Sequence, residues 1–264
     1  MSDIKLYQGD CLEIMKQISD KSIDMILCDL PYGTTACKWD TIIPFDKLWE
    51  QYKRIRKDNA PIVLFASEPF GSALVMSNVK EFREEIIWLK NRSGSAFRPN
   101  QKHIKIHEKI YIFSKDGNYT FNPQKWLVSE KDFLTQRRTF KETEVGNQIY
   151  GKIKRVPKED VGERNPLSIV SCKVPFNPQK RSTYSSDVDV RIHPTQKPLK
   201  LLEYLIKTFS NIDELVLDNC IGSGTTGVAC KLLNRNFIGI ELDENYFKIA
   251  KERIDNTIVP KRLF

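Results

Sequence analysis

A short polar turn directly after an apolar run is the first feature of the sequence that could do chemistry. Residues 23–28 are mostly apolar, as in a parallel strand buried on both faces, and Asp29-Leu30-Pro31-Tyr32-Gly33 follows them. The turn therefore stands at the carboxyl end of a strand, where α/β folds bind ligands. Taken alone it could also be only a turn, because Pro fixes φ and Gly permits a positive φ.

The residue types of this turn suit one kind of reaction. The nitrogen of an aryl amine is a poor nucleophile, because its lone pair is delocalised into the ring. The Asp29 carboxylate and a main-chain carbonyl near Leu30 and Pro31 could accept hydrogen bonds from the two N–H groups of the amine. These hydrogen bonds would return electron density to the nitrogen and orient its lone pair. Tyr32 could stack on a base extruded from a duplex, since the amine is out of reach within the stack.

A glycine-rich turn near the other end of the chain is the second such feature. Residues 215–241 are typical of a strand, a turn at 218–227, a helix and a further strand ending in Glu241. Glycines let the backbone approach a ligand closely, and we expect Thr225 and Thr226 to cap the helix. Glu241 could accept two hydrogen bonds from a ribose diol. A dinucleotide site and a purely structural turn are alternatives, but the turn contains no basic residue, which argues against a dinucleotide.

Seven strands and the helices between them must position these two turns. Apolar runs predict strands at residues 4–10, 23–28, 62–66, 85–89, 109–113, 214–218 and 237–240. Helical spacing of apolar residues predicts helices at 12–18, 48–55, 199–209, 228–232 and 244–254. This alternation predicts an α/β fold with a doubly wound, mostly parallel sheet of seven strands.

The order of the elements predicts a circular permutation. After Glu241 the chain supplies one helix and stops, so the next strand of a nucleoside-binding sheet must come from elsewhere. The N-terminal strand, which ends at Gly9 and Asp10, supplies it. We therefore expect Asp10 or the Cys11 backbone to lie beside a bound adenine.

The positive charge of the chain is concentrated in its middle. The net charge is +8, and residues 91–190 hold 19 Lys and Arg against 11 Asp and Glu, which leaves the rest of the chain neutral. From about residue 118 to 190 apolar periodicity also fades, in a stretch too long for a simple connection. A solvated basic surface is one interpretation. The location favours the other, a segment that faces DNA phosphates, because neutralised phosphates release counterions.

Composition favours a cytoplasmic protein without membrane segments or metals. No apolar run approaches the roughly 18 residues of a membrane span, and the first residues do not resemble a signal peptide. The six cysteines are scattered without a CxxC pair and are expected to be reduced thiols. His103 and His107 lie four apart, but the alternation around them is typical of a strand and no third ligand is near, so we expect no metal site.

Together the two turns resemble the S-adenosylmethionine-dependent amino-methyltransferases of DNA. The resemblance is to the permuted (beta) group of the adenine-N6 and cytosine-N4 family, and it covers about residues 1–115 and 190–256, including His193-Pro194-Thr195-Gln196-Lys197-Pro198. It implies a catalytic half at 1–115, a basic target-recognition insertion at 116–190 and a cofactor-binding half at 191–264. The sequence departs from the family at Leu30, where a second proline is frequent, and at Asn219-Cys220, where Pro-Phe is frequent.

The resemblance also implies roles for individual residues. Catalysis would fall to Asp29, Leu30, Pro31 and Tyr32. The implied contacts of S-adenosylmethionine are Asp10, Cys11, Asp29, Thr195, Lys197, Asp218, Cys220, Gly222, Ser223, Gly224, Thr225, Thr226, Glu241 and Leu242, with Thr195 and Lys197 at the methionine end. The candidates for DNA contacts, either to bases or to phosphates, are Arg92, Arg98, Arg137, Arg138 and Arg155.

The activity that we expect is site-specific methylation of adenine N6 in double-stranded DNA. Members of the family with Asp first usually modify adenine, while Ser is commoner for cytosine N4, which is the alternative in the same class. An RNA or a protein amide as substrate, or a DNA-binding module without activity, are further alternatives, and the two complete turns argue against the last. A bacterial or phage origin, a homodimer and a cognate restriction endonuclease also fit the resemblance.

Overall fold

The chain folds into two compact units in the computed structural model. One consists of residues 1–122 and 168–264, and the other of residues 123–167. The structure describes residues 2–35, 40–91, 100–101, 103–127, 143–147, 151–155, 162–174 and 196–259, with the backbone alone at 143–147 and 151–155.

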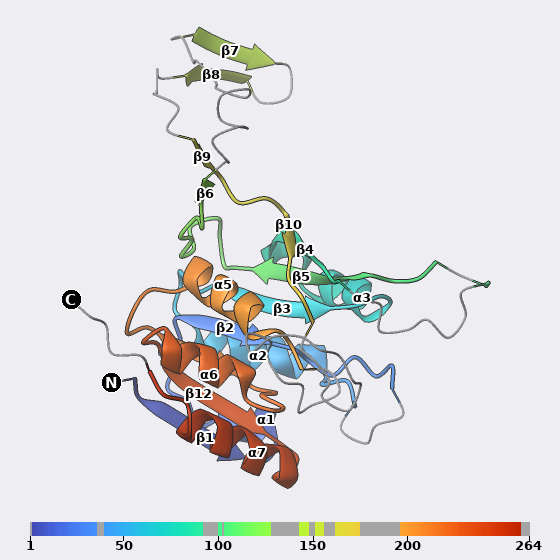
Figure 1. Ribbon diagram of the computed structural model, residues 1–264, viewed down its shortest axis with the longest axis vertical. Helices are drawn as coiled ribbons and strands as arrows, with labels where there is room; N and C mark the ends of the chain where they lie inside the picture. The colour runs from blue at the N-terminus through green and yellow to red at the C-terminus, as the bar shows by residue number, and fades with distance from the viewer. Residues whose placement is uncertain are drawn as a thin grey trace, which may run out of the picture. The chain divides into compact units, whose positions relative to one another are not determined.

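The larger unit is built around one eight-stranded sheet (Figure 1). Its strands lie in the order β1 (Ile4–Gln8), β12 (Asn236–Glu241), β11 (Leu215–Asp218), β2 (Met25–Cys28), β3 (Ile62–Ala66), β5 (His107–Phe113), β4 (Phe82–Leu89) and β10 (Ile169–Ser171). All neighbours pair in parallel except β5, which is antiparallel to both β3 and β4. The predicted α/β fold with a mostly parallel sheet is confirmed, and each of the seven predicted strands is present.

The eighth strand, β10, was not predicted. It extends the edge of the sheet beside β4, with Ile169 opposite Ile87, and the Ile87 N–H donates to the Ser168 carbonyl at 2.7 Å. It comes from the part of the chain that the sequence assigns to the insertion. Two of its three residues are exposed, so no apolar pattern marks it in the sequence.

The N-terminal strand completes the sheet as the permuted order predicts. β1 lies beside β12, dark blue next to red in Figure 1, and Gln8 is opposite Glu241. The Gly9 N–H donates to the Glu241 carbonyl at 2.8 Å. The first strand of the chain is therefore the neighbour of its last.

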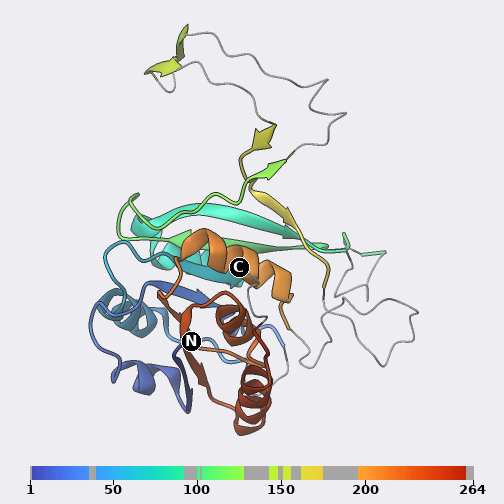
Figure 2. The same ribbon diagram turned by 60° about the vertical axis from the view of Figure 1, so that its left-hand side comes forward.

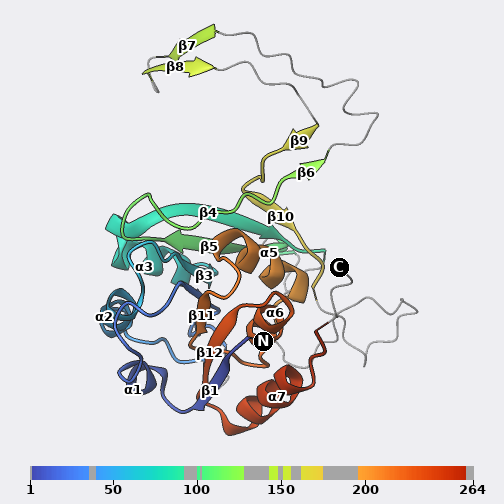
Figure 3. The same ribbon diagram turned by 90° about the vertical axis from the view of Figure 1, so that its left-hand side faces the viewer.

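Helices cover both faces of this sheet (Figures 2 and 3). On one face lie α1 (Cys11–Met15), α2 (Phe45–Ile55) and α3 (Phe70–Ser77), which the 3₁₀ helix η1 (Val79–Glu81) follows; on the other lie α5 (Leu199–Phe209), α6 (Thr225–Leu232) and α7 (Glu244–Asp255). Met15 and Tyr52 are buried in the core of the first face, and Phe209 and Ile254 in that of the second. Within the described ranges, none of these helices has the length and apolar character needed to cross a membrane.

Two helices that follow parallel strands, α1 after β1 and α6 after β11, begin in different ways. The Asp10 carboxylate caps α1 by accepting two N–H groups of its first turn at 2.8 and 3.1 Å. α6 instead has Gly224 at its N-cap, in the left-handed conformation and without a side-chain hydrogen bond. The expectation that Thr225 and Thr226 cap this helix is therefore wrong. The Thr226 hydroxyl donates to Asp218 at 2.6 Å instead, because it faces the end of β11.

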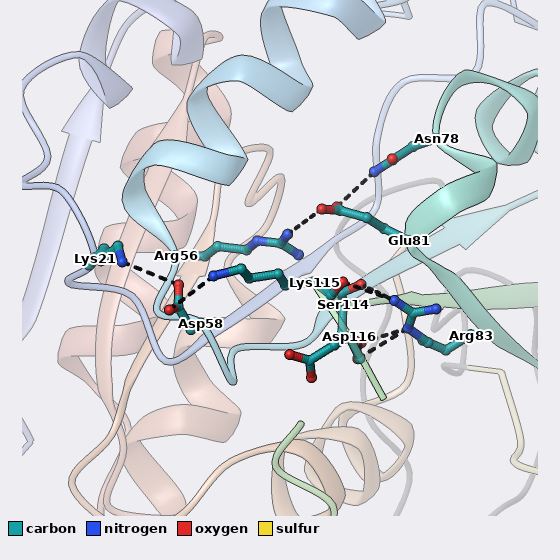
Figure 4. A network of polar contacts seen from close by, with 9 residues as sticks. All are labelled: Lys21, Arg56, Asp58, Asn78, Glu81, Arg83, Ser114, Lys115 and Asp116. Atoms are coloured by element: carbon teal, nitrogen blue, oxygen red, sulfur yellow. Dashed lines mark hydrogen bonds and ion pairs between the residues drawn. The ribbon is translucent and has the colours of Figure 1, made fainter. Parts of the chain in front are cut away.

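A polar network stands at the amino ends of β3 and β4, the sheet edge opposite to Asp29 (Figure 4). The buried Arg56 and the partly buried Glu81 form an ion pair of 2.6 Å, and Asn78 donates to the same carboxylate at 3.0 Å. Arg83 donates to main-chain carbonyls of residues 114–116, which follow β5. Since these contacts tie strand ends together, we interpret the network as structural.

Among its described residues, the smaller unit has two antiparallel pairs of strands. β6 (Trp126–Leu127) pairs with β9 (Glu163–Arg164), and β7 (Thr143–Asn147) pairs with β8 (Gly151–Arg155). Trp126 and Leu127 are exposed, and the Lys125 ammonium lies 2.8 Å from the Glu163 carboxylate. The sequence does not predict these strands; in β6 and β9 three of the four residues are exposed, so no buried apolar pattern marks this pair.

Candidate active site

Four adjacent parallel strands end at one edge of the large sheet, and the predicted site residues lie at their ends. β1, β12, β11 and β2 are neighbours that run in the same direction. Glu241 ends β12, Asp218 ends β11, and Asp29 directly follows β2. The fold thus brings the Asp29 turn and the glycine turn to the same edge, although they lie in opposite parts of the sequence.

Asp29 is the centre of the first group of contacts. Its Oδ1 accepts a hydrogen bond from Tyr32 Oη at 2.7 Å, and its Oδ2 lies 2.5 Å from Lys197 Nζ. Burial raises the pKa of Asp29 above its ordinary value, and the charge of Lys197 only partly opposes this rise. Each carboxylate oxygen has a second lone pair, so Asp29 can accept a further N–H bond.

The ring of Tyr32 is held on one side by other aromatic rings. Its centroid lies 5.0 Å from that of Phe70, with the rings 30° apart, and the Phe45 ring lies 5.6 Å from Phe70. Burial, followed by the charge of Asp29, raises the pKa of Tyr32 well above its ordinary value. The phenol therefore keeps its proton and acts as a donor to Asp29.

Asp40 fixes the main chain of the turn. One of its oxygens accepts the N–H groups of Tyr32 and Gly33 at 2.7 and 2.8 Å, and the other accepts those of Thr34 and Thr35 at 2.9 and 2.6 Å. Burial would raise the pKa of Asp40, but these hydrogen bonds outweigh it and lower the pKa. Sequence reasoning missed this residue, because nothing in its position shows that the loop wraps around it.

The glycine turn leaves room for a ligand beside its backbone. Gly222, at a φ of 51°, and Gly224, at 78°, are both in the left-handed region. A Cβ on Gly222 would meet no atom within 4 Å, whereas one on Gly224 would lie 2.9 Å from the Cβ of Ala250. Gly224 is therefore required by packing, while Gly222 faces open space.

Glu241 joins this turn to the loop after β12. Its Oε2 accepts the Gly222 N–H at 2.8 Å, and its Oε1 accepts the Asp243 N–H at 2.9 Å. Burial raises the pKa of Glu241, although the two N–H groups oppose the rise. A carboxylate has about four lone-pair positions, so Glu241 can accept further hydrogen bonds from ribose hydroxyls. The open space at Gly222 and this carboxylate fit the nucleoside part of the implied cofactor.

A buried carboxyl and buried thiols lie under the turn. Asp218 accepts from the Thr226 hydroxyl at 2.6 Å and from the Cys220 N–H at 3.1 Å, and burial raises its pKa to about 6. Burial also raises the pKa of Cys28 to about 12. The nucleophilic form of cysteine is the thiolate, and with this pKa Cys28 stays a protonated thiol at neutral pH. Cys28 is therefore a packed and unreactive residue. No group of three or more potential metal ligands occurs in the described part of the chain.

The structure says less about the other residues predicted from the sequence. Cys11, Ser223 and Thr225 are buried near the turn, and Leu242 is exposed beside Glu241. Their contacts with the cofactor, and those of Asp10 and Lys197, stay predictions. Outside the described residues lie Thr195, Arg92, Arg98, Arg137 and Arg138, and Arg155 ends β8 without a described side chain.

Two charged residues near Lys197 were also missed. Glu108, the second residue of β5, has its Oε2 3.4 Å from Lys197 Nζ, and Lys90 forms an ion pair with its other oxygen. Because β5 is antiparallel to β3, it begins at the edge where β3 ends. The signal in the sequence is a carboxylate at the start of a buried strand, but its use requires knowledge of the strand direction.

Comparison with known proteins identifies relatives along nearly the whole chain. The model of the DNA methylase family matches residues 23–252. The chain is 30% identical over 266 residues to the DNA adenine methyltransferase YhdJ of Escherichia coli (strain K12), covering 95% of this chain and 82% of that protein. It is 28% identical over 265 residues to the type II methyltransferase M1.MboII of Moraxella bovis, covering 93% and 94%. The crystal structure of an M1.HpyAVI–SAM complex is similar with a TM-score of 0.60 and 26% identity, covering 95% of this chain and 99% of that one.

Proposed function

The chain belongs to the N6/N4 DNA methylase family, whose methyl donor is S-adenosylmethionine, and from this premise we propose that it methylates adenine N6 at specific sites in double-stranded DNA. One observation carries the proposal: the Asp29 turn and the glycine turn lie at the same sheet edge, at the ends of the adjacent strands β2 and β11. A residue that can activate an amine and a turn that can hold a nucleoside thus stand side by side.

The Asp29 turn activates the target amine. The Asp29 carboxylate accepts a hydrogen bond from one N–H group of the target amine, and a main-chain carbonyl near Leu30 or Pro31 accepts one from the other N–H group. These two acceptors orient the nitrogen lone pair out of the plane of the base. The negative charge of Asp29 would also stabilise the positive charge that develops on the nitrogen as its lone pair bonds to the methyl carbon and the bond from that carbon to the sulfonium sulfur breaks. The sulfur would keep the electron pair of the broken bond, and the nitrogen would then lose one N–H proton and become neutral. No covalent bond to the enzyme is needed.

Tyr32 holds the base that carries the amine. Phe70 packs on one side of the Tyr32 ring, and the hydroxyl is bound to Asp29. Both contacts restrict the ring, so it can serve as a fixed surface for a base that has left the duplex. A base stacked on this ring would lie next to Asp29, its proposed hydrogen-bond acceptor.

The cofactor supplies the electrophilic methyl group. Gly222 leaves space for the cofactor beside the main chain. The Glu241 carboxylate, which also accepts the Gly222 N–H, would accept hydrogen bonds from the ribose hydroxyls. Asp10, Cys11 and Leu242 then border the adenine. The remaining residues that we assign to this site are Thr195, Lys197, Asp218, Cys220, Ser223, Gly224, Thr225 and Thr226.

Adenine is favoured over cytosine by two observations. The catalytic turn begins with Asp, as in family members that usually modify adenine, and the relative YhdJ is named as an adenine methyltransferase. Cytosine N4 is the alternative, since the same acceptors would serve either amine. An RNA or a protein amide is less favoured, because the family that matches is one of DNA methylases.

The middle of the chain, residues 116–190, is assigned to recognition of the target sequence. It holds 13 Lys and Arg against 10 Asp and Glu, a net charge of +3 that suits binding to phosphates. The proposed DNA contacts are Arg92, Arg98, Arg137, Arg138 and Arg155. A homodimer, a cognate restriction endonuclease and a cytoplasmic site of action in a bacterium or phage-infected cell complete the proposal, supported by relatives named as type II methyltransferases.

Transfer of a radiolabelled methyl group to nucleic acid tests this function. The protein is incubated with labelled S-adenosylmethionine and with DNA or RNA duplexes of the same mixed sequence, which are then digested to nucleosides. We expect the label in N6-methyldeoxyadenosine, and none in a duplex made only of G·C pairs. Label in N4-methyldeoxycytidine would establish the alternative, and label only in RNA would overturn both. Sequencing of modified bases in cells that express the protein then yields the target site.

A further inference from the structure

Four side chains of alternating charge form a series that ends at Asp29. Lys90 pairs with Glu108, Glu108 Oε2 lies 3.4 Å from Lys197 Nζ, and Lys197 Nζ lies 2.5 Å from Asp29 Oδ2. Their exposed fractions are 15% for Lys90, 17% for Glu108, 8% for Lys197 and 24% for Asp29. They belong to four different segments, which meet at the carboxyl edge of the sheet.

The need to neutralise the charge of Asp29 does not by itself explain why the series continues beyond Lys197. Lys197 and Asp29 would already form a neutral pair, and a buried ion pair is weak support for stability because desolvation offsets the attraction. Glu108 nevertheless places a second carboxylate beside Lys197. Within the described residues its buried Oε2 has no hydrogen-bond partner, and Lys197 is its contact at 3.4 Å.

We propose that Glu108 is a positioning residue for the methyl-transfer reaction, because it shares the Lys197 ammonium with Asp29. This inference rests on the proposed function. If Lys197 faced Asp29 alone, the pair would be tighter and the Asp29 carboxylate would be a weaker acceptor for the target amine. Glu108 draws part of the positive charge to itself, and Lys90 holds Glu108 in place from the other side.

The charges around Asp29 act on its pKa in opposite directions. Burial makes the largest contribution and raises the pKa, Lys197 lowers it, and Glu108 raises it. Loss of Glu108 should therefore lower the pKa of Asp29, and loss of Lys197 should raise it. The titratable groups that face Asp29 are Lys197, Glu108, Tyr32, Cys28 and Asp218. Those that face Glu108 are Lys90, Lys105, Lys197, Asp29 and Tyr32.

The pH dependence of kcat for methyl transfer to duplex DNA tests the proposal. In Glu108→Gln we expect kcat to fall at least about tenfold and its acid limb to move to lower pH. In Lys197→Met the acid limb should move to higher pH. A merely structural role would lower the rate without moving the limb in opposite directions. The matched control is Glu85→Gln, a half-buried β4 carboxylate 3.2 Å from Lys109, which should keep the wild-type profile.

Titration of the Asp29 carboxyl by ¹³C NMR, assigned with Asp29→Asn, gives a readout that does not depend on activity. Its pKa should be lower in Glu108→Gln and higher in Lys197→Met than in the wild type. If Glu108→Gln does not fold, Lys90→Met removes the outer charge and should raise the pKa. Equal pKa values in the wild type and these variants would overturn the proposal. Absence of methyl transfer by the wild type would instead overturn the proposed function, while this titration still decides the effect of Glu108 on Asp29.

Discussion

Lys197 and Asp29 form an ion pair of 2.5 Å although 168 residues separate them in the sequence. Asp29 follows β2, and Lys197 precedes α5, which leads into β11, the neighbour of β2 in the sheet. The contact therefore joins the Asp29 turn to the half of the chain that carries the glycine turn. Since the two halves meet at one edge, substitutions in each should affect separate steps of the same reaction.

Gly222 and Gly224 should respond differently to alanine. Gly222→Ala places a Cβ in open space, so beyond roughly 1 kcal/mol of backbone strain the fold should persist. The dissociation constant for S-adenosylmethionine should rise at least about tenfold, or ~1.4 kcal/mol. Gly224→Ala places a Cβ 2.9 Å from the Ala250 Cβ, so the free energy of unfolding should fall by about 1–3 kcal/mol in addition to strain. Calorimetric titration and urea denaturation measure the two quantities.

Gly117→Ala is the control for this pair. A Cβ at Gly117 also meets nothing within 4 Å, and its φ is outside the left-handed region, so both quantities should match the wild type. Wild-type cofactor affinity in Gly222→Ala would show that the open space beside the turn is not used.

Asp40→Ala should impair methyl transfer more than cofactor binding. The substitution removes the acceptor of four N–H groups at residues 32–35, so the turn loses its fixed conformation. We expect kcat to fall by about 10- to 100-fold with an unchanged dissociation constant for S-adenosylmethionine. Asp46→Ala, at an exposed acid in the first turn of α2, should behave as the wild type. Weaker cofactor binding with an unchanged kcat would contradict this role.

The buried Asp218 should make stability depend on pH. Burial raises its pKa from 3.8 to about 6, so the folded protein binds this proton more tightly than the unfolded chain does. Its stabilising contribution is complete below about pH 4 and is lost as the pH rises through 6. Relative to Asp218→Asn, the free energy of unfolding of the wild type should therefore fall between pH 4 and 6, by roughly 3 kcal/mol at most. Urea denaturation at pH 4, 5, 6 and 7 gives this difference, and parallel curves for the two proteins would refute it.

The sheet edge at which the site lies could be predicted, because it is defined by where the parallel strands end and the sequence marks those ends. Asp29 and Glu241 each stand at the end of a readable apolar run, and parallel strands place such ends along one edge. The pairing of β1 with β12 could likewise be predicted, because the expected sheet needs a further strand beside the one that ends at Glu241, and the N-terminal apolar run can supply it.

Loop conformation and strand direction could not be predicted in the same way. Asp40 acts through main-chain N–H groups, which have no sequence signature, and Glu108 reaches Lys197 only because β5 is antiparallel. The expected cap by Thr225 and Thr226 was wrong because Gly224 begins α6 with a positive φ. In each case the contact depends on the backbone conformation or on the direction of a strand, and the local sequence does not specify either.

Single-turnover methyl transfer by Asp29→Asn tests the central claim most directly. Asparagine keeps the size of the side chain but removes its charge and replaces one accepting oxygen with a donor. With saturating S-adenosylmethionine and duplex DNA, we predict a rate about 10²- to 10³-fold below the wild type, with unchanged dissociation constants for both. Transfer at the wild-type rate, or a loss of cofactor binding large enough to explain the lower rate, would contradict the role of Asp29 as the acceptor of the target amine.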